Sequence, residues 1–197
     1  MTAFFLLFFA AVVRVSSTPV AHDPKLDVTY NGILRDGTET FLSVPYGKDT
    51  SGEHRFKPPR RYIPTRGSTI NAKSIGSECP QPKGDQFFPL YLQNITDVSE
   101  DCLHLNVYRA QGTTSSDKLP VMLYIHGGSF YIGSKDELVI QPGGLIMKSV
   151  QIGHPILFVT INYRLGGRDP HWTPLVPILI LCSLRIRAIK GSKERRV

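Results

Sequence analysis

The run Pro120–Phe130, PVMLYIHGGSF, constrains the fold more than any other part of the sequence. Its first half is entirely apolar or aromatic, which predicts a strand over Val121–Gly127 that is covered on both faces, as in a parallel sheet. The strand opens into His126-Gly127-Gly128-Ser129, where two glycines permit a close approach of the backbone. Free N–H groups at the carboxyl edge of a sheet suit an oxyanion hole for acyl transfer, and a plain Gly-Gly turn is the alternative.

Length and charge set outer bounds on the protein. With 197 residues, 41% of them hydrophobic, the chain has enough material for one core and for one domain or a small pair. The formal net charge is +7, and residues 167–197 hold seven Lys and Arg against two acidic residues. Because most of the charge lies in this tail and aromatic residues do not alternate with its basic residues, we expect no nucleic-acid partner.

The N-terminus, Met1–Ser17, has the character of a secretory signal peptide. Phe4–Val13 is an unbroken apolar run, and small residues precede a possible cleavage after Ser17, with Val20-Ala21 as a second candidate site. The run is too short to cross a bilayer, so we expect no transmembrane segment. The sequence therefore predicts a secreted, extracellular protein.

Two further features fit an oxidising compartment. Asn94-Ile95-Thr96 is an N-glycosylation sequon without a central proline. Cys79 and Cys102 flank a loop-rich segment, and a bridge between them would contribute about 3 kcal/mol through chain entropy. Cys182, in the basic tail, is the third cysteine.

The remaining elements are predicted from periodicity and turn residues. Asn31-Gly32 predicts a tight hairpin between two short strands in Lys25–Arg35, at the start of an antiparallel meander. Seven prolines make Pro45–Pro89 irregular. The other predicted elements are strands at Glu39–Val44, Leu103–Tyr108 and Ile156–Ile161, and a short helix within Ile140–Val150 after the Pro142-Gly143-Gly144 break.

Four separated motifs, in order, resemble the type-B carboxylesterase/lipase family of α/β-hydrolases, which includes the cholinesterases. They are FLSVPY at 41–46, RFKPP at 55–59, EDCLHLNV at 100–107 and NYRLG at 162–166. Ser43 and Gly47 depart from the family pattern. The resemblance covers residues 24–166, which we expect to form a partial α/β domain, with antiparallel hairpin strands leading into a mostly parallel sheet. Residues 1–17 precede it as the signal peptide, and 167–197 follow as a divergent basic tail.

The resemblance implies a role for each matching residue. Gly127, Gly128 and Ser129 stand where the family builds its oxyanion hole, with the N–H groups of Gly128 and Ser129 as donors and Gly127 making the tight approach. Ser129 replaces a glycine of the family. The remaining implied roles are structural: a Cys79–Cys102 disulfide and an Arg55–Glu100 ion pair.

The catalytic groups of such an enzyme are not in this sequence. No G-x-S-x-G nucleophile elbow occurs among the 197 residues, and the resemblance stops after Gly166. The tail is explained either by a truncated product or by a genuine short isoform, in which it could attach to a membrane surface. His126 lies in the turn but has no nucleophile partner, so we expect a structural role. His104 is expected to face the surface, and no histidine spacing indicates a metal.

The family function is hydrolysis of small-molecule or lipid carboxylic esters through an acyl-enzyme, without a cofactor. Since the catalytic Ser, acid and His are missing, this chain is expected to be an inactive, truncated form. The alternatives are a non-catalytic esterase-like binding or adhesion module and a non-functional truncated product.

Overall fold

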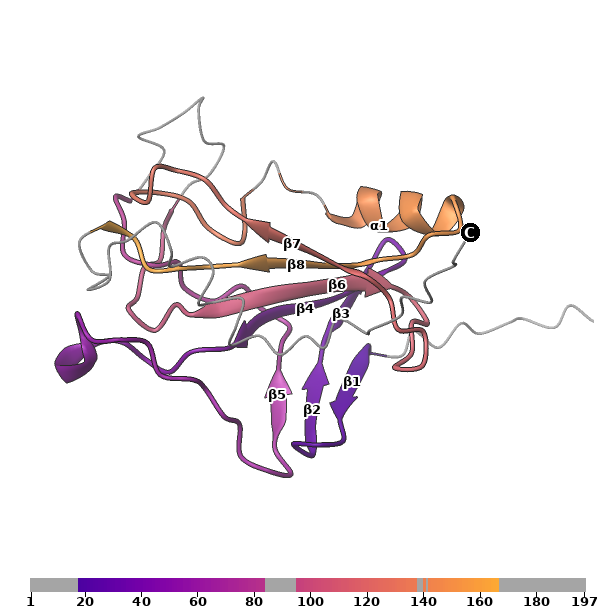
Figure 1. The fold of residues 1–197 in the computed structure, drawn as a ribbon, viewed down its shortest axis with the longest axis horizontal. Helices are drawn as coiled ribbons and strands as arrows, with labels where there is room; N and C mark the ends of the chain where they lie inside the picture. The colour runs from indigo at the N-terminus through magenta and orange to yellow at the C-terminus, as the bar shows by residue number, and fades with distance from the viewer. Residues whose placement is uncertain (1–17, 84–94, 138–139, 141, 167–197) are drawn as a thin grey trace, which may run out of the picture.

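The computed structural model describes residues 18–83, 95–137, 140 and 142–166 (Figure 1). The predicted signal peptide, the sequon residue Asn94 and the basic tail lie outside the described residues.

Two β-sheets form the body of the described part. The smaller one contains β1 (Val20–Asp23), β2 (Val28–Asn31) and β5 (Thr69–Asn71), in the order β1-β2-β5. The larger one has the order β3-β4-β6-β8-β7, with β3 at Ile33–Arg35, β4 at Thr38–Pro45, β6 at His104–Ala110, β7 at Val121–Ile125 and β8 at Leu157–Ile161. A short 3₁₀ turn, η1, spans Gly52–His54, and one α-helix, α1, spans Pro142–Gln151.

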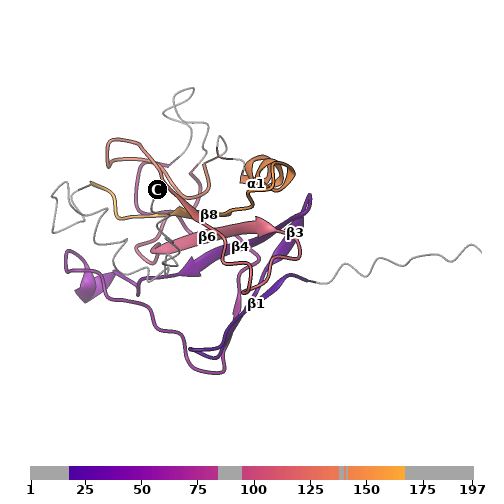
Figure 2. The same ribbon diagram turned by 45° about the vertical axis from the view of Figure 1, so that its right-hand side comes forward.

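In the larger sheet, antiparallel strands lead into a parallel pair. β3, β4, β6 and β8 are antiparallel neighbours, while β7 and β8 run parallel. α1 lies between β7 and β8 in the chain and covers one face of the sheet against β4, β6 and β8 (Figure 2). The β7-α1-β8 unit is the crossover that a parallel pair requires.

The predicted hairpin at Asn31-Gly32 is wrong. β2 and β3, which flank this dipeptide, pair in different sheets, and the chain instead turns between β1 and β2 and at Asp36-Gly37. A Cβ on Gly32 would lie 2.6 Å from the carbonyl oxygen of Thr40 in β4. The glycine is therefore needed because β4 packs against it, and no tight turn is formed there.

Two further expectations need correction. β7 ends at Ile125, before the glycines, and it is the edge strand of the described sheet. One of its faces is not covered within the described residues, since Met122 is 50% exposed. α1 begins at Pro142 instead of after the Pro-Gly-Gly segment. Proline suits the first turn of a helix because the N–H that it lacks has no intrahelical partner there.

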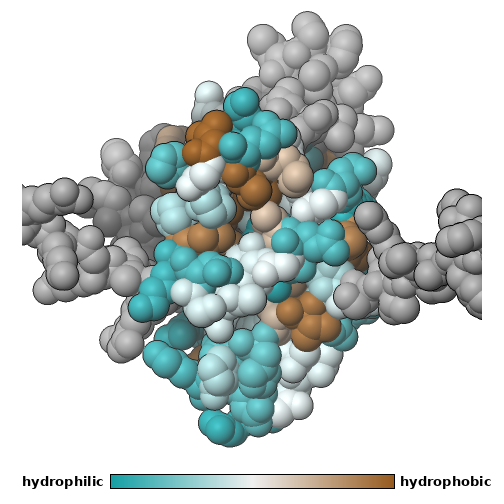
Figure 3. Space-filling model, turned by 90° about the vertical axis from the view of Figure 1, so that its right-hand side faces the viewer, coloured by the Kyte–Doolittle hydropathy of each residue, from teal (hydrophilic) through white to brown (hydrophobic). Residues whose placement is uncertain are grey.

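Within the described residues, buried hydrophobic side chains form two clusters. One is built on the larger sheet by Leu105, Val159 and Ile161. The other lies beyond the ends of β6 and β8 and contains Cys79, Cys102, Leu103, Tyr163 and Leu165. Figure 3 faces the right-hand side of Figure 1 and shows separate hydrophobic areas on a largely hydrophilic surface. Exposed apolar residues include four in or next to α1: Leu145, Met147, Val150 and Ile152.

Candidate active site

The candidate site is the turn that follows β7. Its backbone leaves the usual regions at three consecutive residues, with φ of +108° at Gly128, +54° at Ser129 and +59° at Phe130. The turn is closed by its own backbone, because the N–H groups of Tyr131 and Ile132 donate to the Gly128 carbonyl at 2.9 and 3.1 Å. Left-handed conformations at two non-glycine residues are strained, and such strain is concentrated at functional sites.

Glycine is required at two positions of this turn. A Cβ on Gly128 would lie 2.0 Å from the carbonyl oxygen of Ile132, so the closest backbone approach is made at this residue. A Cβ on Gly133 would lie 2.3 Å from Nδ1 of His126. Both glycines also have a positive φ. The turn can close only because neither residue has a side chain.

The N–H groups of Gly128 and Ser129 are the candidate donors of this turn. Among the residues that the structure describes, neither N–H has a hydrogen-bond acceptor. They lie just beyond the carboxyl end of β7, next to the end of the NYRLG segment, where the Gly166 N–H donates to the Phe130 carbonyl at 2.6 Å. Two adjacent donors in this arrangement can bind an oxyanion.

His126 is buried beside the turn and is held by Tyr163. The imidazole stacks on the Tyr163 ring, with 4.2 Å between centroids, and its Nδ1 lies 2.9 Å from the Gly127 carbonyl oxygen. Burial lowers the pKa of His126 to about 4. Since a carbonyl only accepts, Nδ1 carries the proton of the neutral ring. The position agrees with a structural role for His126.

A buried ionic cluster supports the chain just after the turn. Lys135 is 1% exposed and pairs with Asp136, whose other oxygen accepts from Asn106 Nδ2 at 2.7 Å. The backbone N–H of Lys135 donates to Asn162 Oδ1 at 2.7 Å. Glu78 is also buried, and desolvation raises its pKa to about 7, against the attraction of Lys135. Sequence analysis missed this cluster, because a Lys-Asp pair in a loop is usually exposed.

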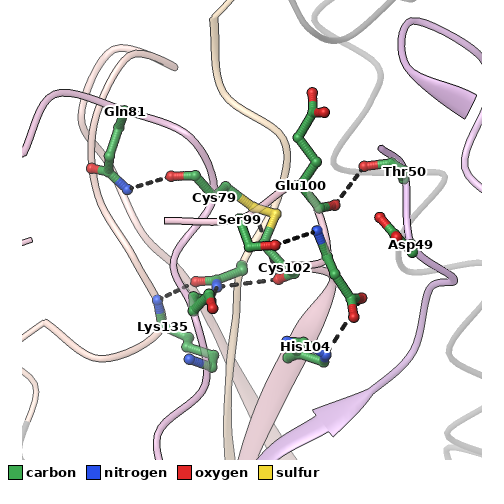
Figure 4. Close-up of a disulfide and its surroundings, with 12 residues drawn as sticks. Asp49, Thr50, Cys79, Gln81, Ser99, Glu100, Cys102, His104 and Lys135 are labelled. Carbon is green, nitrogen blue, oxygen red and sulfur yellow. Dashed lines mark hydrogen bonds and ion pairs between the residues drawn. A yellow bond between two sulfur atoms is a disulfide. The ribbon is translucent and has the colours of Figure 1, made fainter. Parts of the chain in front are cut away.

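The disulfide between Cys79 and Cys102 is buried in the same core cluster as Tyr163, and Figure 4 shows its surroundings. Around it, the Thr50 hydroxyl donates to the Glu100 carbonyl at 2.7 Å, and the Gln81 amide donates to the Cys79 carbonyl at 3.1 Å. Gln81 also forms a reciprocal pair with the backbone of Gly133, both bonds at 2.9 Å. The disulfide-closed segment is thereby tied to the end of the turn.

The other motif residues lie at the periphery of the site. Arg55 and Glu100 form a bidentate ion pair, with Arg55 Nη2 2.6 Å from Glu100 Oε2. Arg164, from NYRLG, donates to the Lys57 carbonyl at 2.8 Å. The expectation that His104 faces the surface is wrong, because its side chain is only 15% exposed and burial lowers its pKa.

Neither a metal cluster nor a membrane-spanning helix occurs in the described residues. They contain no group of three or more His, Cys, Asp or Glu side chains arranged to hold a metal ion. None of their helices has both the length and the apolar character to cross a bilayer.

Comparison with known proteins decides the family. The model of the carboxylesterase family matches residues 28–167, which is most of the chain and includes every residue of the turn. The chain belongs to the carboxylesterase family.

Two relatives of this carboxylesterase-family chain differ in the activity that their names describe. An inactive carboxylesterase-like protein, VdtD, of Byssochlamys spectabilis is 45% identical over 153 residues, covering 76% of this chain and 26% of the relative. A secreted lipase of Arthroderma benhamiae is 40% identical over 151 residues, covering 77% of this chain and 26% of the relative. The chain thus spans about a quarter of the length of these relatives.

Solved structures of the family place the described sheets in an α/β-hydrolase. A thermophilic pNB esterase aligns with a TM-score of 0.63 and 31% identity, covering 77% of this chain and 29% of the esterase. EstA of Aspergillus niger aligns with a TM-score of 0.60 and 31% identity, covering 77% and 27%. The predicted family and fold class are confirmed, as a partial region of the fold.

Proposed function

We propose that Gly127, Gly128 and Ser129 form the oxyanion hole of a serine carboxylic-ester hydrolase, of which this chain carries one part. The observation that carries the proposal is the pair of N–H groups at Gly128 and Ser129, which have no acceptor within the described residues, at the carboxyl end of a strand. Membership of the carboxylesterase family supports the same reaction class. The substrate is a small-molecule or lipid carboxylic ester.

The chemistry follows from where charge develops. Attack of a serine hydroxyl on the ester carbonyl forms a tetrahedral intermediate with a negative oxygen, and collapse to the acyl-enzyme releases the alcohol. Donors aimed at that oxygen stabilise the transition state, and one such donor is worth about 10²–10³ in kcat. Since no G-x-S-x-G elbow occurs in the 197 residues, the nucleophile has to come from elsewhere, and we expect a polypeptide of these residues alone to be inactive.

A chimera tests the proposal. Residues 28–166 of this chain would replace the matching segment of the thermophilic pNB esterase, which would supply the nucleophile, acid and base. We expect the chimera to hydrolyse p-nitrophenyl butyrate, and Gly128→Ala to abolish that activity because the new methyl displaces the turn. Gly112→Ala, at a remote positive-φ glycine with open space around it, is the matched control.

The second candidate is a non-catalytic esterase-like module. It is favoured by the name of the 45% identical relative, which describes that protein as inactive. A chimera that folds, as judged by circular dichroism and thermal unfolding, yet has no esterase activity would support this candidate and contradict the first.

We also propose that the chain is secreted, with its predicted signal peptide removed and Asn94 glycosylated. The buried disulfide and relatives that are named secreted lipases support this proposal. Expression in a fungal host should release the protein into the medium with a glycosidase-sensitive mobility that Asn94→Gln removes. Retention of the chain inside the cell would contradict secretion.

A further inference from the structure

The two donors of the proposed oxyanion hole belong to peptides that are held in different ways. A peptide group is planar, so its carbonyl direction fixes the direction of the N–H on the following residue. The Gly128 carbonyl, which shares a peptide with the Ser129 N–H, accepts from two backbone N–H groups of the turn. The Gly127 carbonyl, which shares a peptide with the Gly128 N–H, accepts from the side chain of His126 at 2.9 Å.

The His126 ring is itself fixed from another part of the chain. Tyr163 follows β8 and is buried, and its ring lies nearly parallel to the imidazole, with an angle of 13° between the planes. The Tyr163 hydroxyl donates to the His126 carbonyl at 2.8 Å and lies 3.5 Å from the Gly127 carbonyl. Phe130 packs edge-on against the same tyrosine, with centroids 6.2 Å apart.

We propose that His126 and Tyr163 are positioning residues that aim the Gly128 N–H into the oxyanion hole. His126 holds the Gly127–Gly128 peptide directly, and Tyr163 holds the imidazole and the preceding peptide. Hydrogen bonding to a peptide carbonyl also polarises its N–H, which strengthens the donor. This inference rests on the proposed function, since the hole is that of the ester hydrolase.

The Ser129 N–H serves as an internal control, because no side chain among the described residues holds its peptide. The Ser129 N–H belongs to a peptide that the backbone alone holds, so loss of the imidazole should disturb Gly128 and leave Ser129 nearly unchanged. A merely structural contribution of His126 to the stability of the turn would disturb both residues.

The test is NMR spectroscopy of the full ¹³C,¹⁵N-labelled chain, which needs no catalytic activity. His126→Phe keeps an aromatic ring for stacking and removes the donor, and Tyr163→Phe removes only the hydroxyl. The matched controls are His104→Phe and Tyr46→Phe, since the hydroxyl of the half-buried Tyr46 donates to another backbone carbonyl, that of Asn162, at 2.6 Å.

We expect His126→Phe to shift the Gly127 carbonyl ¹³C and Gly128 ¹⁵N resonances several times more than His104→Phe does, with Ser129 nearly unmoved. Tyr163→Phe should shift the same resonances and add exchange broadening at Gly128, which Tyr46→Phe should not do. Equal shifts at Gly128 and Ser129, or none at Gly128, would overturn the proposal. If His126→Phe does not fold, Tyr163→Phe gives the same decision.

The chimera with the pNB esterase allows a kinetic test of the same proposal. There His126→Phe should lower kcat about tenfold and leave KM within about twofold, because the misaimed donor acts only in the transition state. An inactive chimera combined with the expected Gly128 shifts would refute the proposed function and leave the positioning of the peptide intact. An active chimera whose kcat is unchanged by His126→Phe would overturn the positioning role.

Discussion

Gly128→Ala should be among the most destabilising single-methyl additions in this protein. The new Cβ would lie 2.0 Å from the Ile132 carbonyl oxygen, roughly 1.4 Å inside ordinary van der Waals contact, and both atoms belong to the backbone. Overpacking costs about 1–3 kcal/mol, and an alanine held at this positive φ costs about 1–3 kcal/mol more. We therefore expect the free energy of unfolding to fall by about 2–6 kcal/mol.

Gly112→Ala isolates the contribution of the backbone angle. Gly112 has φ of +82°, but no atom lies within 4 Å of the point that a Cβ would occupy, so only strain of about 1–2 kcal/mol is expected. Urea unfolding followed by far-ultraviolet circular dichroism would measure both variants with the disulfide intact. The reasoning is refuted if the two variants lose the same free energy within error.

Three other perturbations give distinct outcomes. Ser129→Gly should raise the free energy of unfolding by about 1 kcal/mol, because it removes the strain of a serine in the left-handed region. Ser43→Gly also removes a positive-φ serine, but it should be stabilised less because it loses the hydroxyl that accepts from the Gly76 N–H at 2.6 Å. Equal stabilisation of the two variants in urea unfolding would contradict this. Burial raises the pKa of Glu78 from 4.5 to about 7, so the folded protein keeps the Glu78 proton at pH values where the unfolded chain has lost it. The stability of the wild type relative to Glu78→Gln should therefore fall as the pH rises from 4.5 to about 7. A stability difference that does not change with pH would refute this. Reducing the disulfide, which joins residues 23 positions apart, should cost about 3 kcal/mol in urea unfolding, and no loss would contradict the chain-entropy argument.

The residues of the turn could be predicted from the sequence because their chemistry is local. Two glycines shortly after a strand favour a turn with unpaired backbone donors, and the four separated motifs along the chain indicated the family. The positioning of Gly128 by Tyr163 could not be predicted in this way. The contact between Tyr163 and His126 joins segments more than thirty residues apart. Nothing in the sequence distinguishes Tyr163 from a tyrosine that only fills the core.

The Asn31-Gly32 error has a similar origin. The dipeptide favours a two-residue turn when its flanking strands pair with each other, and here each pairs in a different sheet. The burial of Lys135 was missed for the same reason. Asn106, which donates to the Asp136 carboxylate, and Asn162, which accepts from the Lys135 N–H, are brought to the Lys-Asp pair only by the fold.

The passage of the chain from one sheet to the other has a consequence for unfolding. β2 ends at Asn31 and β3 begins at Ile33, so a single glycine joins the two sheets there. Ala72 also links the two sheets. Its N–H donates to the Asn31 carbonyl of β2, and its carbonyl accepts from the Leu42 N–H of β4, both at 2.8 Å. Because the connection is one residue long and is bridged by these two hydrogen bonds, the sheets cannot separate without breaking them. We therefore expect the two sheets to unfold as one cooperative unit.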